Sequence, residues 1–263
     1  MKPRTPGFWL IAVLLGLLAL LPLQALAGMS PAEVLKFQNC MAKAKQGDAI
    51  SQYNAGVYYN NGDGVPRDRV QSLYWYRKAA EQGYLNAEYR LGEMYHAGVI
   101  VAKDDLEAFK WFSKAANQGH TQAQYNVGHF YEKGYGVTRD MKMALYWYRS
   151  AGAQGYAMAQ FNVGHCYANG LGVGKDHVQA VSWYRRAAMQ GDAIAQRILA
   201  DYYAKGEGAA KNELDAYVFY SLAGTLDVEA SNKAAVLEKK LSRSDVAAGQ
   251  RRVKELQKYI APQ

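Results

Sequence analysis

Apolar and polar positions along the chain repeat with two periods, a short one typical of helices and a longer one of 36 residues. Small or apolar side chains recur every four positions at Ala123, Val127 and Tyr131, which is the stripe of an amphipathic helix. Residues 48–83, 84–119, 120–155 and 156–191 align with one another without a gap, and a degenerate fifth segment covers residues 192–227. Equal segments at a fixed spacing predict a stack of repeated units.

Each unit carries residues that typically end one helix and begin the next, as in a helical hairpin. A glycine ends the first helix, because the left-handed conformation of a C-terminal cap costs glycine nothing. After a short loop, an aspartate or asparagine stands where its side chain caps the second helix. The glycines are Gly62, Gly98, Gly134, Gly170 and Gly206, and the predicted caps are Asp68, Asp104, Asp140, Asp176 and Asn212.

Aromatic side chains recur at the same positions of successive units and predict the core. Trp75, Trp111, Trp147 and Trp183 are one period apart, and each precedes another aromatic residue. We expect Trp147 to be a central core side chain. Glycines such as Gly128 lie in the middle of the first helices, where glycine costs about 1 kcal/mol relative to alanine. We expect them to allow close approach to an alanine-rich face of the second helix.

These residues together resemble the SEL-one-like repeat, a branch of the tetratricopeptide superfamily. In the third unit the pattern appears as Ala123-Gln124, Gly128, Tyr131, Gly134-Tyr135-Gly136-Val137, Asp140, Ala144, Trp147-Tyr148 and Gln154-Gly155. The resemblance covers residues 48–227, with departures such as Ile100 in the second unit and Gly152 in the third. It implies an all-α fold, an α/α solenoid of 36-residue helix-turn-helix repeats with terminal capping helices, that serves as an interaction scaffold.

The two ends of the chain differ from the repeats. Residues 1–27 combine a basic start, an apolar run and the small-residue site Ala25-Leu26-Ala27, which predicts a signal peptide cleaved before Gly28. An uncleaved membrane anchor is the alternative. Residues 28–47 resemble an N-terminal capping helix that starts with a Ser30 and Glu33 capping box. Residues 228–263 are predicted to form basic C-terminal capping helices.

Charge and cysteine content narrow the range of partners. Without residues 1–27 the chain has 29 Lys and Arg against 23 Asp and Glu, and residues 228–263 hold eight basic and four acidic side chains. Such a basic end suits an anionic glycan, an anionic lipid or an acidic protein, although a solvated helix face explains it equally well. Cys40 and Cys166 are more than three units apart, so we expect two free, buried thiols and no disulfide.

The candidate partner-binding residues form three columns on the exposed side of the first helices, which line the concave surface in tetratricopeptide-like stacks. Asparagine offers donors and acceptors for a peptide backbone or sugar hydroxyls, and aromatic rings offer apolar contact. A repeated asparagine that persists only through duplication is the alternative explanation. The columns are Asn54, Arg90, Asn126 and Asn162; Glu93, His129, His165 and Asp201; and Tyr53, Tyr89, Tyr125 and Phe161.

The second column also raises the question of a metal. His129 and His165, with Glu93 or Asp201, are ligand types that Zn²⁺ accepts. Equivalent residues of successive repeats are commonly too far apart for short metal bonds, so we expect solvated histidines, no metal and no other cofactor.

No catalytic motif accompanies these columns, so we expect the protein not to be an enzyme. Some cysteine-rich relatives have been described as hydrolases, but they carry paired cysteines in each unit, and this chain does not. The sequence favours a periplasmic or secreted scaffold or adaptor that binds a protein or peptide segment of the cell envelope. A binder of cell-wall or exported polysaccharide is the alternative. Export disfavours nucleic acid, and a membrane is expected only through an uncleaved signal segment.

Overall fold

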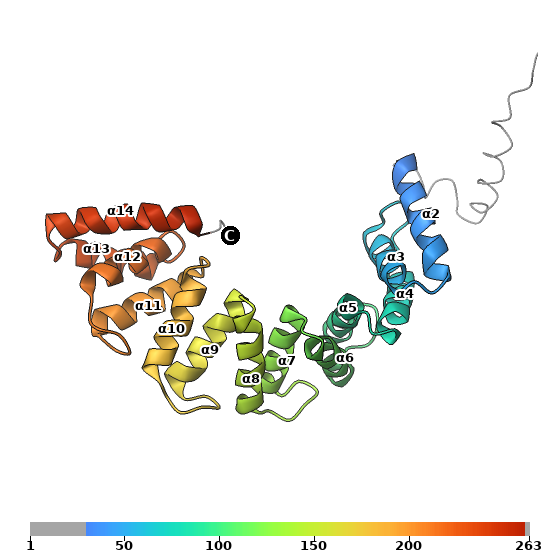
Figure 1. The fold of residues 1–263 in the computed structure, drawn as a ribbon, viewed down its shortest axis with the longest axis horizontal. Helices are drawn as coiled ribbons and strands as arrows, with labels where there is room; N and C mark the ends of the chain where they lie inside the picture. Colours follow the sequence, from blue (N-terminus) through green and yellow to red (C-terminus); the bar gives the residue numbers. More distant parts are fainter. Residues whose placement is uncertain (1–29, 261–263) are drawn as a thin grey trace, which may run out of the picture. The chain divides into compact units, whose positions relative to one another are not determined.

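The computed structural model describes residues 30–260, and this part of the chain is helical without a β-strand. The helices α2 to α14 form two compact units, with the boundary between Lys103 and Asp104. In the second unit the helices follow one another in chain order (Figure 1), and α14 packs against α12. The expected all-α solenoid of helix pairs is therefore confirmed.

Each repeat contains two helices, called here the first and the second helix. The first helices are α3 (Ala49–Asn61), α5 (Leu85–Ala97), α7 (Thr121–Lys133), α9 (Ala157–Asn169) and α11 (Ala193–Lys205). The second helices are α4 (Arg69–Glu81), α6 (Asp105–Asn117), α8 (Met141–Ala153), α10 (His177–Ala188) and α12 (Glu213–Ala223). The ends are α2 (Pro31–Lys45), α13 (Val228–Glu238) and α14 (Arg243–Tyr259).

The helix boundaries follow from the predicted caps. Asp140 accepts hydrogen bonds from the backbone N–H groups of Lys142 and Met143 at the start of α8, and the four equivalent residues cap their helices in the same way. Gly134 ends α7 in the left-handed conformation, with a φ angle of 77°. Ser30 and Glu33 form the expected capping box on α2. Local sequence therefore fixes where the helices begin and end.

In the third repeat, the most deeply buried aromatic residue is not the one that we predicted. Tyr148 is fully buried with 0% exposure, whereas Trp147 is only half-buried. A Cβ atom added to Gly128 would lie 2.8 Å from Cδ1 of Tyr148, so the mid-helix glycine makes room for this ring. The expected close approach of the second helix is therefore present: the added atom would also lie 3.1 Å from the carbonyl oxygen of Ala144, and the ring of Tyr148 fills the remaining space. Gly56 and Gly164 face Tyr76 and Tyr184 in the same way.

A row of buried glutamines joins the helices, and we call each of these contacts a glutamine clamp. Gln124 in α7 donates from Nε2 to the carbonyl oxygen of Ala116 at 3.2 Å, near the end of α6. Its Oε1 accepts from Nε2 of Gln154, which follows α8, at 2.8 Å. One side chain thereby connects three consecutive helices. Gln52 and Gln160 make both contacts in their own repeats, and Gln196 makes the first.

Both cysteines are free thiols, as expected. Cys166 is buried, and burial raises its pKa to about 11. Cys40 is only half-buried, and its Sγ donates to the carbonyl oxygen of Ser51 at 3.2 Å. Within residues 30–260 no helix is long and apolar enough to cross a membrane. The predicted signal peptide lies outside the described residues.

Candidate functional site

In the N-terminal of the two compact units, which ends at Lys103, the predicted columns come together through Arg90. Its guanidinium donates to Oε2 of Glu93 at 2.7 Å and is also hydrogen-bonded to Tyr53. Arg90 further lies 6.0 Å from the ring centroid of Tyr89. Asn54 is exposed on the same helix as Tyr53. Members of all three columns are therefore neighbours in this unit, as the spacing predicts.

In the C-terminal of the two compact units, which begins at Asp104, Tyr125 connects the aromatic, imidazole and amide columns. Its ring is parallel to that of His129, with an interplanar angle of 4° and a centroid separation of 6.4 Å. The Tyr125 side chain is hydrogen-bonded to Asn162, which belongs to the next first helix. Burial raises the pKa of Tyr125, and this hydrogen bond offsets part of the shift. The three residues form a joint between α7 and α9.

The aromatic column also has a packing role that the sequence analysis did not assign to it. The ring centroid of Tyr125 lies 5.6 Å from that of Tyr148 and 5.2 Å from that of Tyr156. Phe161 approaches Tyr184 with a centroid separation of 5.6 Å. Because these rings are half-buried, only part of each remains available to a partner. The polar columns are more accessible at His165, which is exposed.

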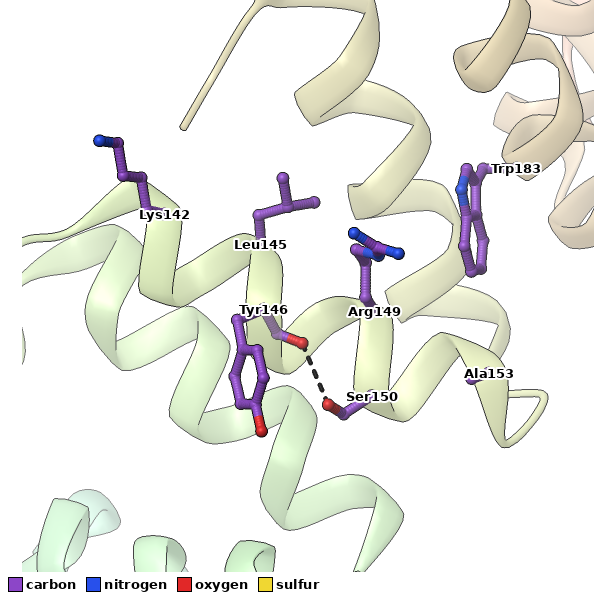
Figure 2. A pocket seen from close by; sticks show the side chains of 7 residues that line it. All are labelled: Lys142, Leu145, Tyr146, Arg149, Ser150, Ala153 and Trp183. Atoms are coloured by element: carbon purple, nitrogen blue, oxygen red, sulfur yellow. Dashed lines mark hydrogen bonds between the residues drawn. The ribbon is translucent and has the colours of Figure 1, made fainter. Parts of the chain in front are cut away.

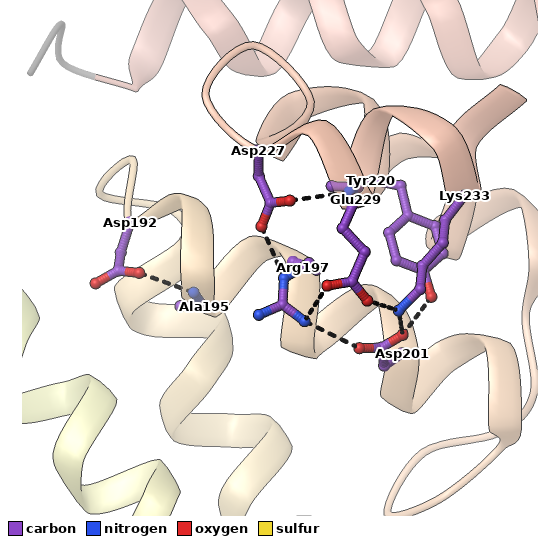
Figure 3. A network of polar contacts seen from close by, with 9 residues as sticks. Asp192, Ala195, Arg197, Asp201, Tyr220, Asp227, Glu229 and Lys233 are labelled. Carbon is purple, nitrogen blue, oxygen red and sulfur yellow. Dashed lines mark hydrogen bonds and ion pairs between the residues drawn. The ribbon is translucent and has the colours of Figure 1, made fainter.

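At the C-terminal end of the columns lies an ion-pair network that the sequence analysis missed (Figure 3). Arg197 of α11 pairs with Asp227, the N-cap of α13, with Nε 2.7 Å from Oδ2. Lys233 of α13 lies 2.9 Å from Asp201 and 2.8 Å from Glu229. Arg197 stands one period after Phe161, so the replacement of an aromatic residue by a cation was the available signal.

The structure does not gather the ligand types considered for Zn²⁺. Among residues 30–260 no group of three or more His, Cys, Asp and Glu side chains is arranged to hold a metal ion. His129 instead contacts the rings of Tyr125 and Tyr135. The arrangement offers hydrogen bonds, charge and aromatic surface, which are means of binding.

The fold defines an α/α solenoid of helical hairpins, and comparison with known proteins identifies its family. The Sel1 repeat model matches residues 49–84, 85–120, 121–156, 157–192 and 193–228. The chain therefore belongs to the Sel1 repeat family, whose members generally act in protein–protein interaction. Each matched segment begins one residue later than the segments aligned above.

Two solved structures support the assignment. A Sel1 repeat protein from Oxalobacter formigenes is 33% identical, with a TM-score of 0.66, and the match covers 74% of this chain and 85% of that one. The protective antigen c5321 of uropathogenic Escherichia coli, which displays the same repeat fold, is 29% identical with a TM-score of 0.57. That match covers 88% of this chain and 57% of the antigen. Among curated proteins no sequence match is found.

Proposed function

We propose that the protein is an exported scaffold or adaptor that binds an extended segment of a partner protein along its first helices. The observation that carries this proposal is the joint of Tyr125, His129 and Asn162, where amide, imidazole and aromatic groups meet on neighbouring first helices. An extended peptide presents a backbone donor or acceptor at every residue. A surface with repeated amides and aromatic edges is suited to bind it.

The contacts between helices support a binding surface on the inner side of a curved stack. The Tyr125–Asn162 hydrogen bond joins the first helices α7 and α9, and ion pairs join the first helix α11 to the end helix α13. On the opposite side, the second helices α8 and α10 border a hollow of about 530 Å³. Close contacts on one side and a gap on the other favour curvature towards the first helices. This interpretation applies to the second unit.

Export is the part of the proposal that rests on residues 1–27. A basic start, an apolar run and a small-residue cleavage site are the three parts of a secretory signal. We therefore place the partner in the periplasm or outside the cell. The basic residues near the C-terminus extend the proposal to partners that carry negative charge.

The test is capture of a partner from a cell-envelope extract by immobilised protein comprising residues 28–263, with separate protein and glycan analysis of the eluate. The captured partner is then titrated against Asn126→Ala and Asn162→Ala variants. We expect binding to weaken by about 1–3 kcal/mol, because polar groups of the partner lose their hydrogen bonds. Recovery of a polysaccharide without protein would contradict the proposal and favour a glycan-binding function.

A matched control separates ligand binding from the joint between the helices. Asn162→Ala removes the contact with Tyr125, so it is expected to cost about 1 kcal/mol of stability on its own. Tyr125→Phe removes the same contact but keeps the Asn162 amide. If the amide binds the partner, Tyr125→Phe retains binding and Asn162→Ala loses it. Equal losses in the two variants would mean that only the geometry of the joint matters.

A further inference from the structure

A hollow lies between the second helices α8 and α10, and residues of these two helices line it (Figure 2). Its volume is about 530 Å³. Two cationic side chains border it, together with aromatic and aliphatic surface, and its lining contains no acidic residue. The main lining residues are Lys142, Leu145, Tyr146, Arg149 and Ala153 of α8 and Trp183 of α10.

Arg149 differs from its counterparts in what it contacts. Arg77 and Arg185 occupy the same position in the first and fourth repeats, and each donates to the hydroxyl of a tyrosine in the following repeat, Tyr95 and Tyr203. Within residues 30–260 the Arg149 side chain has no hydrogen bond or ion pair and borders the hollow instead. Its five N–H donors are therefore available to a ligand.

Lys142 is also specific to the third repeat. The equivalent positions hold the apolar residues Val70, Leu106 and Val178. In the described chain the Lys142 ammonium group has no carboxylate partner. It lies seven residues before Arg149 on one helix, which corresponds to about 10 Å along the axis. Two unpaired cations therefore stand at separate points of the same hollow.

Other departures from the repeat pattern open the space between these cations. Lys114 and Arg186 lie 3.9 and 4.5 Å above the rings of the tryptophans of their own helices, but the third repeat has Ser150 at this position. The Ser150 hydroxyl group donates a hydrogen bond to the carbonyl oxygen of Tyr146 in its own helix, with an oxygen–oxygen distance of 3.1 Å. Ala153 replaces the larger Glu81, Asn117 and Met189 of the other repeats.

Gly152 allows the ring of Trp183 to lie close to α8. A Cβ atom at this position would lie 3.2 Å from Cζ3 of Trp183, which is tighter than ordinary contact. The three equivalent positions in the first, second and fourth repeats hold alanine. The exceptions to the repeat in α8 thus converge on one place, and each of them adds a free cation or removes bulk.

We propose that this hollow is a second binding site, which takes an acidic peptide segment with an aromatic or aliphatic side chain between its carboxylates. The carboxylates pair with Lys142 and Arg149, and Arg149 offers the planar donor geometry that suits a carboxylate. The apolar side chain contacts Leu145 and the rings of Tyr146 and Trp183. A peptide suits the site because the cations flank an apolar hollow, whereas a flat row of cations would suit a membrane surface.

This site is independent of the proposed function, because it uses the second helices and a different ligand chemistry. A fluorescein-labelled peptide with a central phenylalanine flanked by glutamates in a glycine–serine frame provides the probe. Fluorescence anisotropy at low ionic strength is expected to show saturable binding. A peptide with glutamine in place of glutamate is expected to bind about tenfold more weakly or not at all, because the charge-assisted hydrogen bonds are lost.

Variants of α8 test the site directly. Arg149→Gln and Lys142→Gln are each expected to weaken binding of the acidic peptide about tenfold. Ala153→Met restores the bulk found in α10 and is expected to reduce binding by filling the hollow, although it adds no charge. Arg77→Gln removes a cation from the equivalent position of the first repeat and is expected to bind like the unmodified protein. Circular dichroism of each variant confirms that it is folded.

Several results would overturn the proposal. Equal binding of the glutamate and glutamine peptides would show that the cations are not recognised. Unchanged affinity in folded Arg149→Gln protein would exclude the assigned residue, and an equal loss in Arg77→Gln would indicate non-specific charge attraction. Arg149-dependent binding to phosphatidylglycerol vesicles, with no binding of the acidic peptide, would replace the peptide by an anionic lipid.

Discussion

The glutamine clamp of the third repeat leads to a quantitative prediction for Gln124→Met. Methionine is close to glutamine in shape but cannot donate to the carbonyl oxygen of Ala116 or accept from Gln154. Gln124 is only 8% exposed, so water does not readily replace these contacts. The variant therefore removes both hydrogen bonds and leaves the packing volume nearly unchanged.

The expected cost is the sum of two unequal effects. Loss of the donor removes one of two hydrogen bonds to the Ala116 carbonyl oxygen, which still accepts from the backbone N–H of Gly119, and costs about 0.5–1.5 kcal/mol. Loss of the acceptor costs about 0.5 kcal/mol, because the Gln154 side chain is exposed and can bond to water. We expect about 1–2 kcal/mol in total, which lowers the melting temperature of a chain of this size by roughly 2–8 °C.

Thermal unfolding followed by far-ultraviolet circular dichroism measures this change, with Gln154→Met for comparison. This variant keeps the bond to Ala116 but removes the contact with Gln124 and two further hydrogen bonds of Gln154, with Thr121 and with the Gly119 carbonyl oxygen. Because the Gln154 side chain is exposed and water can replace these bonds, we expect a loss of about 1 kcal/mol or less. The double variant is expected to be less destabilised than the sum of the single variants, because they share one hydrogen bond. A Gln124→Met protein that melts with the unmodified protein would refute the assigned role of the clamp.

Three further predictions follow from the core, an ion pair and the N-terminal segment. Tyr148→Ala is expected to cost about 3–5 kcal/mol in chemical denaturation and Trp147→Ala clearly less, because only the tyrosine is fully buried; the reverse order would contradict the described core. A backbone hydrogen bond at the start of α13 and the pair with Arg197 outweigh burial and lower the pKa of Asp227, so its stabilisation is present above the usual aspartate pKa and disappears as the pH falls through the lowered value. Asp227→Asn is therefore expected to reduce the loss of stability between neutral pH and about pH 3, and an unchanged profile would argue against this contribution. N-terminal sequencing of exported protein is expected to begin at Gly28, whereas an intact N-terminus in the membrane fraction would favour an anchor.

The repeat period and the helix boundaries could be predicted from the sequence because their causes are local. Asp140 caps the helix that begins at the next residue, and Gly134 ends the helix directly before it. The depth of the aromatic residues was harder to predict. Trp147 and Tyr148 are adjacent on one helix and both are large and partly apolar, so their burial depends on which neighbouring helix each meets. The glycine opposite Tyr148 decides this contact.

The candidate site residues also divide into those whose positions follow from helical spacing and those whose contacts do not. Helical spacing and the repeat period place Tyr125, His129 and Asn162 near one another, and the structure joins them. Their use in binding a partner stays a prediction. The clamp formed by Gln124 was not predictable from one repeat, because it connects three helices and bonds to a backbone carbonyl group. The unpaired state of Arg149 could not be predicted either, because Arg77 and Arg185 occupy the same position in other repeats and each contacts a tyrosine.

The glutamine clamps have a consequence for the gene as well as for the protein. Gln160 and Gln196 bond to carbonyl groups at the same position of the preceding second helix, at Gly152 and Ala188. Deletion of residues 156–191 in frame would present Gln196 with the carbonyl group that Gln160 now uses. Unequal crossing-over among the third, fourth and fifth repeats can therefore shorten or lengthen the array by whole repeats while each new junction keeps its hydrogen bond, so the length of the protein is open to evolution in steps of one repeat.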